Sequence, residues 1–177
     1  QVDTAQQVDL VRWMVRQDKA DWPSDIELVV FDFDGVMTDN KVEVTENGDE
    51  FVRCNRSDGL GIDHLRDANI PMIVLSTEKH PIVKLRCEKL QLPCHQGIGN
   101  KAKYLTEYLQ KENIDASKVA YLGNDMNDLE CLHMVGFPVV VADADPSVLG
   151  AARIVLSTPG GQGAVREFSD KLLAAKK

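Results

Sequence analysis

The stretch LVVFDFDGVMTD, residues 28–39, determines the fold that we predict for this chain. Its first part, LVVF, is a continuous apolar run, which is typical of a strand buried on both faces of a sheet. Asp32 and Asp34 follow this run, and Gly35 then permits a sharp turn. Two neighbouring carboxylates at an apolar strand end lose hydration and repel one another, so stability alone does not explain them. The stretch therefore predicts a functional loop at the carboxyl end of a buried strand.

Further apolar runs of the same kind alternate with helical patterns along the rest of the chain. The predicted strands lie within residues 28–34, 71–76, 118–125, 137–143 and 152–157, and the predicted helices lie around 59–69, 81–91, 101–113 and 126–136. Buried strands that alternate with helices indicate an α/β fold, a three-layer, Rossmann-like, doubly wound parallel sheet. Residues 41–54 differ, because two alternating stretches flank Asn47-Gly48, which predicts an inserted β-hairpin.

The composition narrows the class of protein. The 177 residues carry a formal net charge of -8, and the sequence pI is about 5.0. This acidity argues against nucleic acid or an anionic membrane as the main partner. No apolar run is long enough to span a membrane, and the first residues lack the zones of a signal peptide. The four cysteines are widely spaced, which predicts reduced thiols and a cytoplasmic location.

Polar residues follow three of the predicted strands. Asp32 and Asp34 end the first, Ser76-Thr77 end the second, and the stretch GNDMND (123–128) ends the third. Ligands of open α/β sheets bind at the carboxyl ends of the strands, so we expect these residues to converge. Taken singly, each residue could be a turn or helix cap. Together, the acids of these loops would form an oxygen-rich site for a hard cation such as Mg²⁺.

Lys101 opens the predicted helix 101–113. A cation in the first turn of a helix interacts unfavourably with the helix dipole, and a bound anion would offset that cost. A solvated surface lysine is the alternative. Carboxylates, a hydroxyl and a lysine in this order fit covalent phosphoryl transfer through an aspartyl-phosphate.

These motifs resemble those of the haloacid-dehalogenase (HAD) superfamily over roughly residues 28–168. FDFDGVMTD is similar to its first motif, IVLST to the second, Lys101 to the third and GNDMND to the fourth. The resemblance implies that Asp32 attacks phosphorus, that Asp34 is the acid and base, and that Ser76 and Lys101 hold the phosphoryl group. It also implies Mg²⁺ held by Asp32, the carbonyl of Asp34 and an acid of the fourth motif.

A subgroup resemblance is carried by the hairpin, by CNRSDGLGI (54–62) and by PGGQGAVRE (159–167). These resemble the capless phosphatases of 2-keto-3-deoxy sugar acids, which include 3-deoxy-octulosonate 8-phosphate phosphatases. The resemblance implies a homotetramer assembled by the hairpins and a tail that closes over a neighbouring active site. The residues then expected to contact the substrate are Gly35, Thr38, Asn55, Arg56, Asp58, Thr77 and Arg166.

The chain departs from that subgroup at two positions. Asn124 stands where many members have aspartate, which leaves open whether Asp125 or Asp128 is the direct metal ligand. Glu78 stands where many members have arginine in the second motif, which argues against the usual eight-carbon substrate.

Residues 1–20 are predicted to form an amphipathic helix, and ADWPSDIE (20–27) is predicted to be a linker. The start of this helix, QVDTAQQVDLVRWMV, resembles the closing helix of a sialic-acid cytidylyltransferase, so the predicted domains are 1–27 and 28–177. This resemblance implies that the chain is the phosphatase module of a bifunctional CMP-sialate synthetase. It also implies a location in the cytoplasm, or in the nucleus if the source is an animal. The first hypothesis is therefore an N-acylneuraminate or deaminated neuraminate 9-phosphate phosphatase. The alternatives are a 3-deoxy-octulosonate 8-phosphate phosphatase and a non-catalytic oligomerisation or regulatory module.

Overall fold

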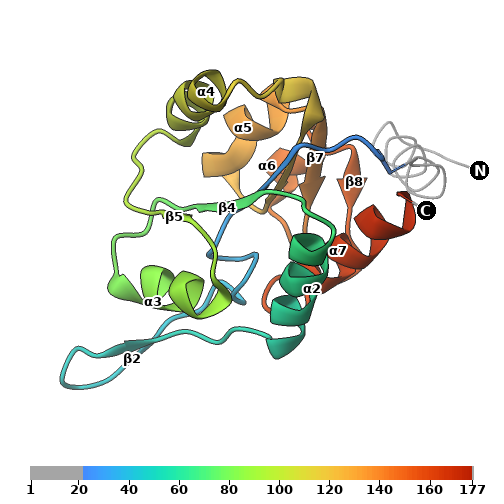
Figure 1. Ribbon diagram of the computed structural model, residues 1–177. Helices are drawn as coiled ribbons and strands as arrows, with labels where there is room; N and C mark the ends of the chain where they lie inside the picture. Colours follow the sequence, from blue (N-terminus) through green and yellow to red (C-terminus); the bar gives the residue numbers. More distant parts are fainter. Residues whose placement is uncertain (1–21, 177) are drawn as a thin grey trace, which may run out of the picture.

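Six parallel strands form the central sheet of the structure, a computed structural model that describes residues 22–176 (Figure 1). Their order across the sheet is β5-β4-β1-β6-β7-β8. The strands are β1 Leu28–Phe31, β4 Met72–Leu75, β5 Cys94–His95, β6 Val119–Gly123, β7 Phe137–Val140 and β8 Ile154–Val155. The predicted doubly wound parallel sheet is thus confirmed, with β1 paired to β4 on one side and β6 on the other.

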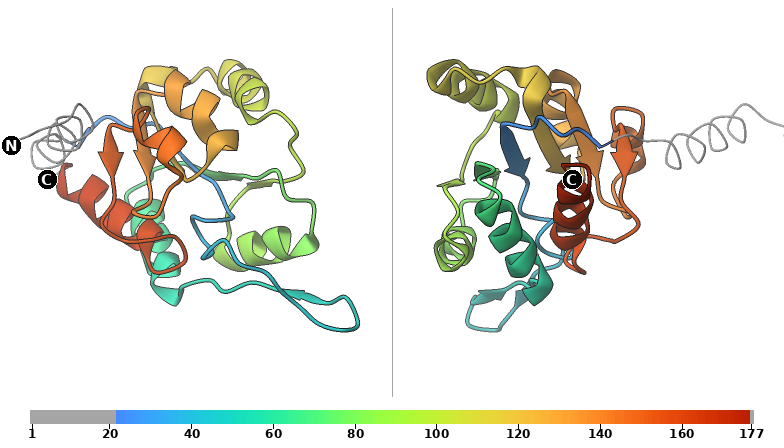
Figure 2. Two further views of the ribbon diagram at one scale, coloured as in Figure 1. Left: turned by 180° about the vertical axis from the view of Figure 1, so that it is seen from behind. Right: turned by 45° about the vertical axis from the view of Figure 1, so that its right-hand side comes forward.

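Helices cover both faces of this sheet (Figures 1 and 2). One layer contains α2 Arg56–Asp67, α3 Pro81–Leu90 and α7 Ala164–Ala174, and the other contains α4 Lys101–Glu112, α5 Leu129–Met134 and α6 Pro146–Leu149. The short 3₁₀ turns η1 Ala116–Lys118 and η2 Met126–Asp128 precede β6 and α5. None of the helices within residues 22–176 is long and apolar enough to cross a membrane.

The two helical layers explain why the strands read as continuous apolar runs. Every residue of β1, β4 and β6 is buried. At one end of the sheet, Trp22 packs against Phe137 and Phe168 with ring centroids 5.1 and 5.5 Å apart. Two residues of the predicted linker, Trp22 and Ile26, therefore pack against this core, and Ile26 is buried. The predicted helix of residues 1–20 lies outside the described residues, and the division of the chain at residue 27 stays a prediction.

The predicted hairpin is present and projects from the body (Figure 1). Its strands, β2 Glu43–Val44 and β3 Glu50–Phe51, are shorter than the alternation suggests. The turn closes with the Thr45 N–H donating to the Asp49 carbonyl at 2.9 Å, and Gly48 takes a φ of 85°. A three-residue turn with glycine in the left-handed region is a common hairpin closure.

Three elements of the fold were not predicted from the sequence. The edge strand β5 and helix α6 are too short to show a periodic pattern. Helix α7 begins directly after Gly160, Gly161 and Gly163, which obscure the start of its apolar face. This helix packs along α2 and completes one layer of the fold.

Candidate active site

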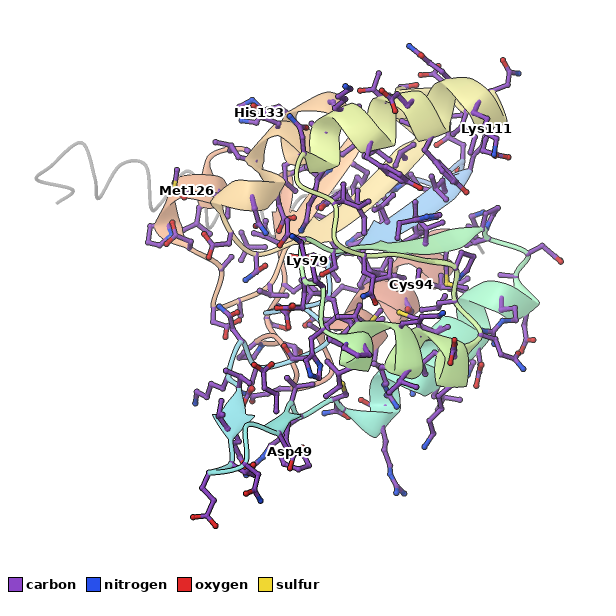
Figure 3. The ribbon with its side chains drawn as sticks, turned by 90° about the vertical axis from the view of Figure 1, so that its left-hand side faces the viewer. Asp49, Lys79, Cys94, Lys111, Met126 and His133 are labelled. Atoms are coloured by element: carbon purple, nitrogen blue, oxygen red, sulfur yellow. The ribbon has the colours of Figure 1, made fainter. Side chains whose placement is uncertain are left out.

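The carboxyl ends of three adjacent strands meet at one edge of the sheet. A cavity of about 360 Å³ opens there, lined by Asp32, Asp34, Asn40, Thr77, Asn124, Asp125 and Asn127. Figure 3 shows Met126, the first residue of η2 after β6, on the left of the view and Asp49, from the hairpin, at its lower end. Asp32, Asp34, Thr77 and Asp125 were all expected at this place, and the structure brings them together because β1 lies between β4 and β6.

The loop after β1 is held in a fixed shape by its own hydrogen bonds. The Phe33 carbonyl accepts from the N–H groups of Met37 and Thr38 at 2.9 and 3.2 Å. The Thr38 hydroxyl oxygen accepts from the N–H groups of Gly35 and Asn40 at 3.2 and 3.3 Å. Gly35 has a φ of 78°, and a Cβ there would lie 2.0 Å from the Asn124 side chain. Gly35 and Thr38 are both buried, so they shape this loop, while their predicted contact with a substrate stays a prediction.

Lys101 forms a buried ion-pair network beneath the cavity. Its Nζ lies 2.7 Å from Asp32 Oδ1 and 2.7 Å from Asp128 Oδ1. Asp128 Oδ2 accepts from the Asn124 N–H at 2.9 Å and, at 3.4 Å, from the Asp125 N–H. One ammonium group thus forms ion pairs with two buried carboxylates. Burial and the Asp128 charge raise the pKa of Asp32 to about 8, although Lys101 acts in the opposite direction.

Three oxygen-bearing groups converge beside this network. One branch of the Asn124 amide lies 3.0 Å from the Asp34 carbonyl oxygen and 3.2 Å from Asp32 Oδ2. With its nitrogen on that side, the amide donates hydrogen bonds to both oxygens. With its oxygen on that side, three oxygens face one another, an arrangement that a hard cation would stabilise. Residues 22–176 contain no group of three or more His, Cys, Asp or Glu side chains that could hold a metal ion, so a metal site here depends on the amide and the carbonyl.

Asp34 is the second carboxylate of the cavity. Burial and the nearby charge of Glu78 raise the pKa of Asp34, and Lys101 and the Thr38 hydroxyl oppose this shift. A carboxyl group that holds its proton to higher pH is suited to general acid catalysis. Glu78 itself is ionised more readily than usual, because the Lys79 and His80 N–H groups donate to its carboxylate and lower its pKa.

Ser76 lies at the end of β4 and is buried. Its N–H donates to the His95 carbonyl at 2.9 Å, and its hydroxyl accepts from the Glu78 N–H at 3.0 Å. These contacts fix the position of the hydroxyl at the strand end. Thr77 is exposed and lines the cavity, as expected for a group that contacts a ligand.

The remaining predicted substrate contacts lie outside the cavity lining. Asn55 caps α2 by accepting from the Ser57 N–H at 2.9 Å, and Arg56 is exposed at the start of that helix. Asp58 is buried and accepts from the Arg166 N–H at 3.1 Å, while the Arg166 side chain pairs with Asp170. Within one chain, Asn55 and Asp58 accept hydrogen bonds at the starts of α2 and α7, and the contact of all four residues with a substrate stays a prediction.

The segment 159–163 packs against its own chain. The Gly161 N–H donates to the Val36 carbonyl at 3.0 Å, and a Cβ on Gly160 would lie 2.0 Å from the Gly35 carbonyl oxygen. Glu167 fixes the preceding turn by accepting from the N–H groups of Ser157 and Thr158 at 3.0 and 2.8 Å. Within one chain this segment therefore supports the loop after β1, and the expectation that the tail closes over a neighbouring active site stays a prediction.

Sequence reasoning missed Asn127 and Asn40, which line the cavity. It noted Asn124 as a departure from the subgroup's aspartate but did not count this uncharged residue among the site residues. The participation of Tyr121, whose hydroxyl contacts Asp128, was also missed because it lies inside an apolar strand.

Comparison with known proteins agrees with this geometry. Residues 95–168 match the model of a family described as haloacid dehalogenase-like hydrolase. A 3-deoxy-D-manno-octulosonate 8-phosphate phosphatase of Salmonella typhi is 37% identical over 152 residues, covering 85% of this chain and 81% of the relative. The phosphatase of the same name from Yersinia pestis superposes with a TM-score of 0.83 at 33% identity, over 86% of this chain and 83% of that one.

A third comparison concerns ligands. The 3-deoxy-D-manno-octulosonate 8-phosphate phosphatase of Moraxella catarrhalis, solved with a magnesium ion, a phosphate ion and KDO, has a TM-score of 0.84 at 27% identity and covers 92% of each chain. Taken together, the matches show that this chain belongs to the haloacid dehalogenase-like hydrolases and is related among them to the 3-deoxy-D-manno-octulosonate 8-phosphate phosphatases.

Proposed function

We propose that this chain is a Mg²⁺-dependent phosphatase of a 2-keto-3-deoxy sugar-acid phosphate, with 3-deoxy-octulosonate 8-phosphate as the favoured substrate. The observation that carries the proposal is a cavity lined by Asp32 and Asn124, in which the Asn124 amide faces Asp32 and the buried Lys101 ammonium group pairs with the same carboxylate. The related phosphatases support the eight-carbon substrate, so they favour it over the nine-carbon acid of the first hypothesis.

Two chemical steps follow from this arrangement. The Asp32 carboxylate attacks phosphorus, the bond from phosphorus to the sugar oxygen breaks, and Asp34 gives its proton to that oxygen. Water then attacks the phosphorus of the aspartyl-phosphate and passes a proton to Asp34, the bond from phosphorus to the Asp32 oxygen breaks, and phosphate leaves with the Asp32 carboxylate regenerated. Lys101 holds the Asp32 carboxylate in place and neutralises part of the local negative charge.

The metal would be held by the Asp32 carboxylate, the Asp34 carbonyl and the Asn124 amide oxygen. When bound, Mg²⁺ supplies positive charge that offsets the repulsion between a carboxylate and a phosphate. Asp128 is less suited to direct ligation, because both its oxygens already accept hydrogen bonds from the protein. The Asp125 carboxylate caps η2 by accepting from the Met126 N–H at 2.6 Å. Asn124 is therefore our preferred third ligand.

A nine-carbon sugar-acid phosphate is the second candidate, and Glu78 favours it. The Glu78 carboxylate lies near enough to Asp34 to raise the pKa of that group. A negative charge near Asp34 disfavours the carboxylate end of a substrate and favours its hydroxyl groups. The neuraminate 9-phosphates carry several hydroxyl groups between phosphate and carboxylate, so we include them among the substrates to be assayed.

The hairpin supports assembly into a homotetramer. Val42, Val44 and Phe51 are 54%, 62% and 54% exposed on an element that projects from the body. Apolar side chains gathered on one projecting element mark an interaction surface. Light scattering of the wild type and of Phe51→Glu would test this assembly, and a wild-type monomer would refute it. Fusion to a cytidylyltransferase concerns residues outside the described part of the chain and stays a prediction.

The function is tested by phosphate release with Mg²⁺ and with EDTA. The substrates are 3-deoxy-octulosonate 8-phosphate, N-acetylneuraminate 9-phosphate and deaminated neuraminate 9-phosphate. We expect Mg²⁺-dependent turnover with the eight-carbon substrate preferred, and a preference for a nine-carbon substrate would support the second candidate. A folded oligomer without turnover on any of them would favour the non-catalytic module.

A further inference from the structure

Tyr121 is a fully buried residue of the central strand β6 that contacts the catalytic network without lining the cavity. Its hydroxyl donates to Asp128 Oδ1 at 2.6 Å. Burial and the Asp128 charge raise the pKa of Tyr121 well above its usual range, so this hydroxyl keeps its proton and remains a donor. It is a neutral group placed among charged ones.

Four groups follow one another in series through the protein. The Tyr121 hydroxyl contacts Asp128, Asp128 contacts Lys101 Nζ at 2.7 Å, and Nζ contacts Asp32 Oδ1 at 2.7 Å. The hydroxyl and the ammonium group share the same Asp128 oxygen. The other Asp128 oxygen accepts from backbone N–H groups, so the carboxylate cannot rotate without losing hydrogen bonds.

The shared oxygen determines how Lys101 divides its interaction between two anions. A carboxylate oxygen with a second donor attracts an ammonium group less strongly than one without it. Without the hydroxyl, Asp128 would draw Nζ toward itself and weaken the contact with Asp32. The lysine side chain has four rotatable bonds, so it can follow such a change.

We infer that Tyr121 is a positioning residue, which holds Lys101 between Asp128 and Asp32 through its hydrogen bond to Asp128. The expected loss of turnover rests on the proposed function. The expected change in the position of Lys101 rests on the geometry alone. A purely structural role, in which the hydroxyl only satisfies a buried polar atom, would change stability and leave the lysine and the turnover of folded protein unaltered.

The first measurement is the steady-state kinetics of Tyr121→Phe, which removes only the hydroxyl oxygen. We expect kcat to fall roughly tenfold, because the activation barrier should rise by an amount on the order of one strong hydrogen bond. The KM and the Mg²⁺ concentration that gives half-maximal activity should stay within about twofold of the wild-type values. Tyr104→Phe is the matched control, because that hydroxyl contacts His95 at 2.8 Å outside this network. A kcat for Tyr121→Phe equal to that of the control would overturn the inference.

The second measurement does not depend on turnover. In protein labelled with ¹⁵N-lysine, the Lys101 ammonium resonance is assigned by its loss in Lys101→Arg. We expect this resonance to shift in Tyr121→Phe and to stay in place in Tyr104→Phe. If the wild type is inactive on all three substrates, the proposed function fails while this shift still supports the positioning role. A resonance that is unchanged in Tyr121→Phe would refute it.

Discussion

Two buried clusters, each built around aspartate, flank the loop after β1, and only one of them is arranged for chemistry. In the first, Asp32 and Asp128 share the single ammonium group of Lys101 beside an open cavity. In the second, Asp58 of α2 accepts from the N–H groups of Val165 and Arg166 at the start of α7. The first cluster has an excess of negative charge that a metal would offset, whereas the second supplies a missing helix cap, since Gly163 has no side chain. Burial of an acid alone therefore does not identify a site.

The strongest test of this contrast is Asp32→Asn. We expect turnover to fall by at least roughly a thousandfold, because the amide cannot form the aspartyl-phosphate. Stability should be unchanged or higher, because burial and the Asp128 charge raise the pKa of Asp32 and the neutral amide relieves that repulsion. Phosphate release and thermal melting measure the two effects. Asp115→Asn, which replaces an exposed cap of η1, is the control, and a large fall in melting temperature for Asp32→Asn alone would indicate a structural aspartate.

The pH dependence of stability tests the second cluster. Burial raises the pKa of Asp58 from its usual 3.8 to about 6. The folded protein then binds this proton more tightly than the unfolded chain, so stability falls as pH rises from about 4 to about 6. Relative to Asp58→Asn, which does not titrate, the wild type should lose about 2 kcal/mol of unfolding free energy between about pH 4.5 and pH 7.5. Urea unfolding of both proteins measures this difference, and a constant difference would contradict the shift.

Asp58→Ala should separate folding from catalysis. We expect a loss of about 1–2 kcal/mol in the free energy of unfolding, because the first N–H groups of α7 lose their acceptor. The kcat of the folded fraction should change by less than about twofold, since Asp58 does not line the cavity. Asp63→Ala, on the exposed side of the same helix, is the matched control. A large fall in kcat without a loss of stability would place Asp58 in the active site instead.

The two clusters also differ in how far the sequence reveals them. The sheet was predictable from local signals, namely the buried strand before Asp32 and the alternation of strands with helices. The edge of the sheet that carries the site was predictable because Ser76 and Asp125 stand at strand ends. Asp58 and Arg166 lie 108 residues apart in sequence, so the cap that joins α2 to α7 is a consequence of tertiary packing. Asn124 was recognised in the sequence only as a departure from the subgroup's aspartate, and its place in the candidate site follows from its position facing Asp32 and the Asp34 carbonyl.

Asn124→Asp would increase the contrast between the clusters by adding a second carboxylate that faces Asp32. In the absence of metal, the added repulsion should lower the melting temperature, because Asp32 Oδ2 lies 3.2 Å from the Asn124 amide. With Mg²⁺ present, the extra charge should tighten metal binding by about tenfold, measured by calorimetry and by the Mg²⁺-dependent rise in melting temperature. Asn127→Asp is the matched control, since Asn127 lines the same cavity and the same charge is added. Equal tightening in both variants would show a general electrostatic effect, whereas tightening in Asn124→Asp alone would identify residue 124 as the position that contacts the metal.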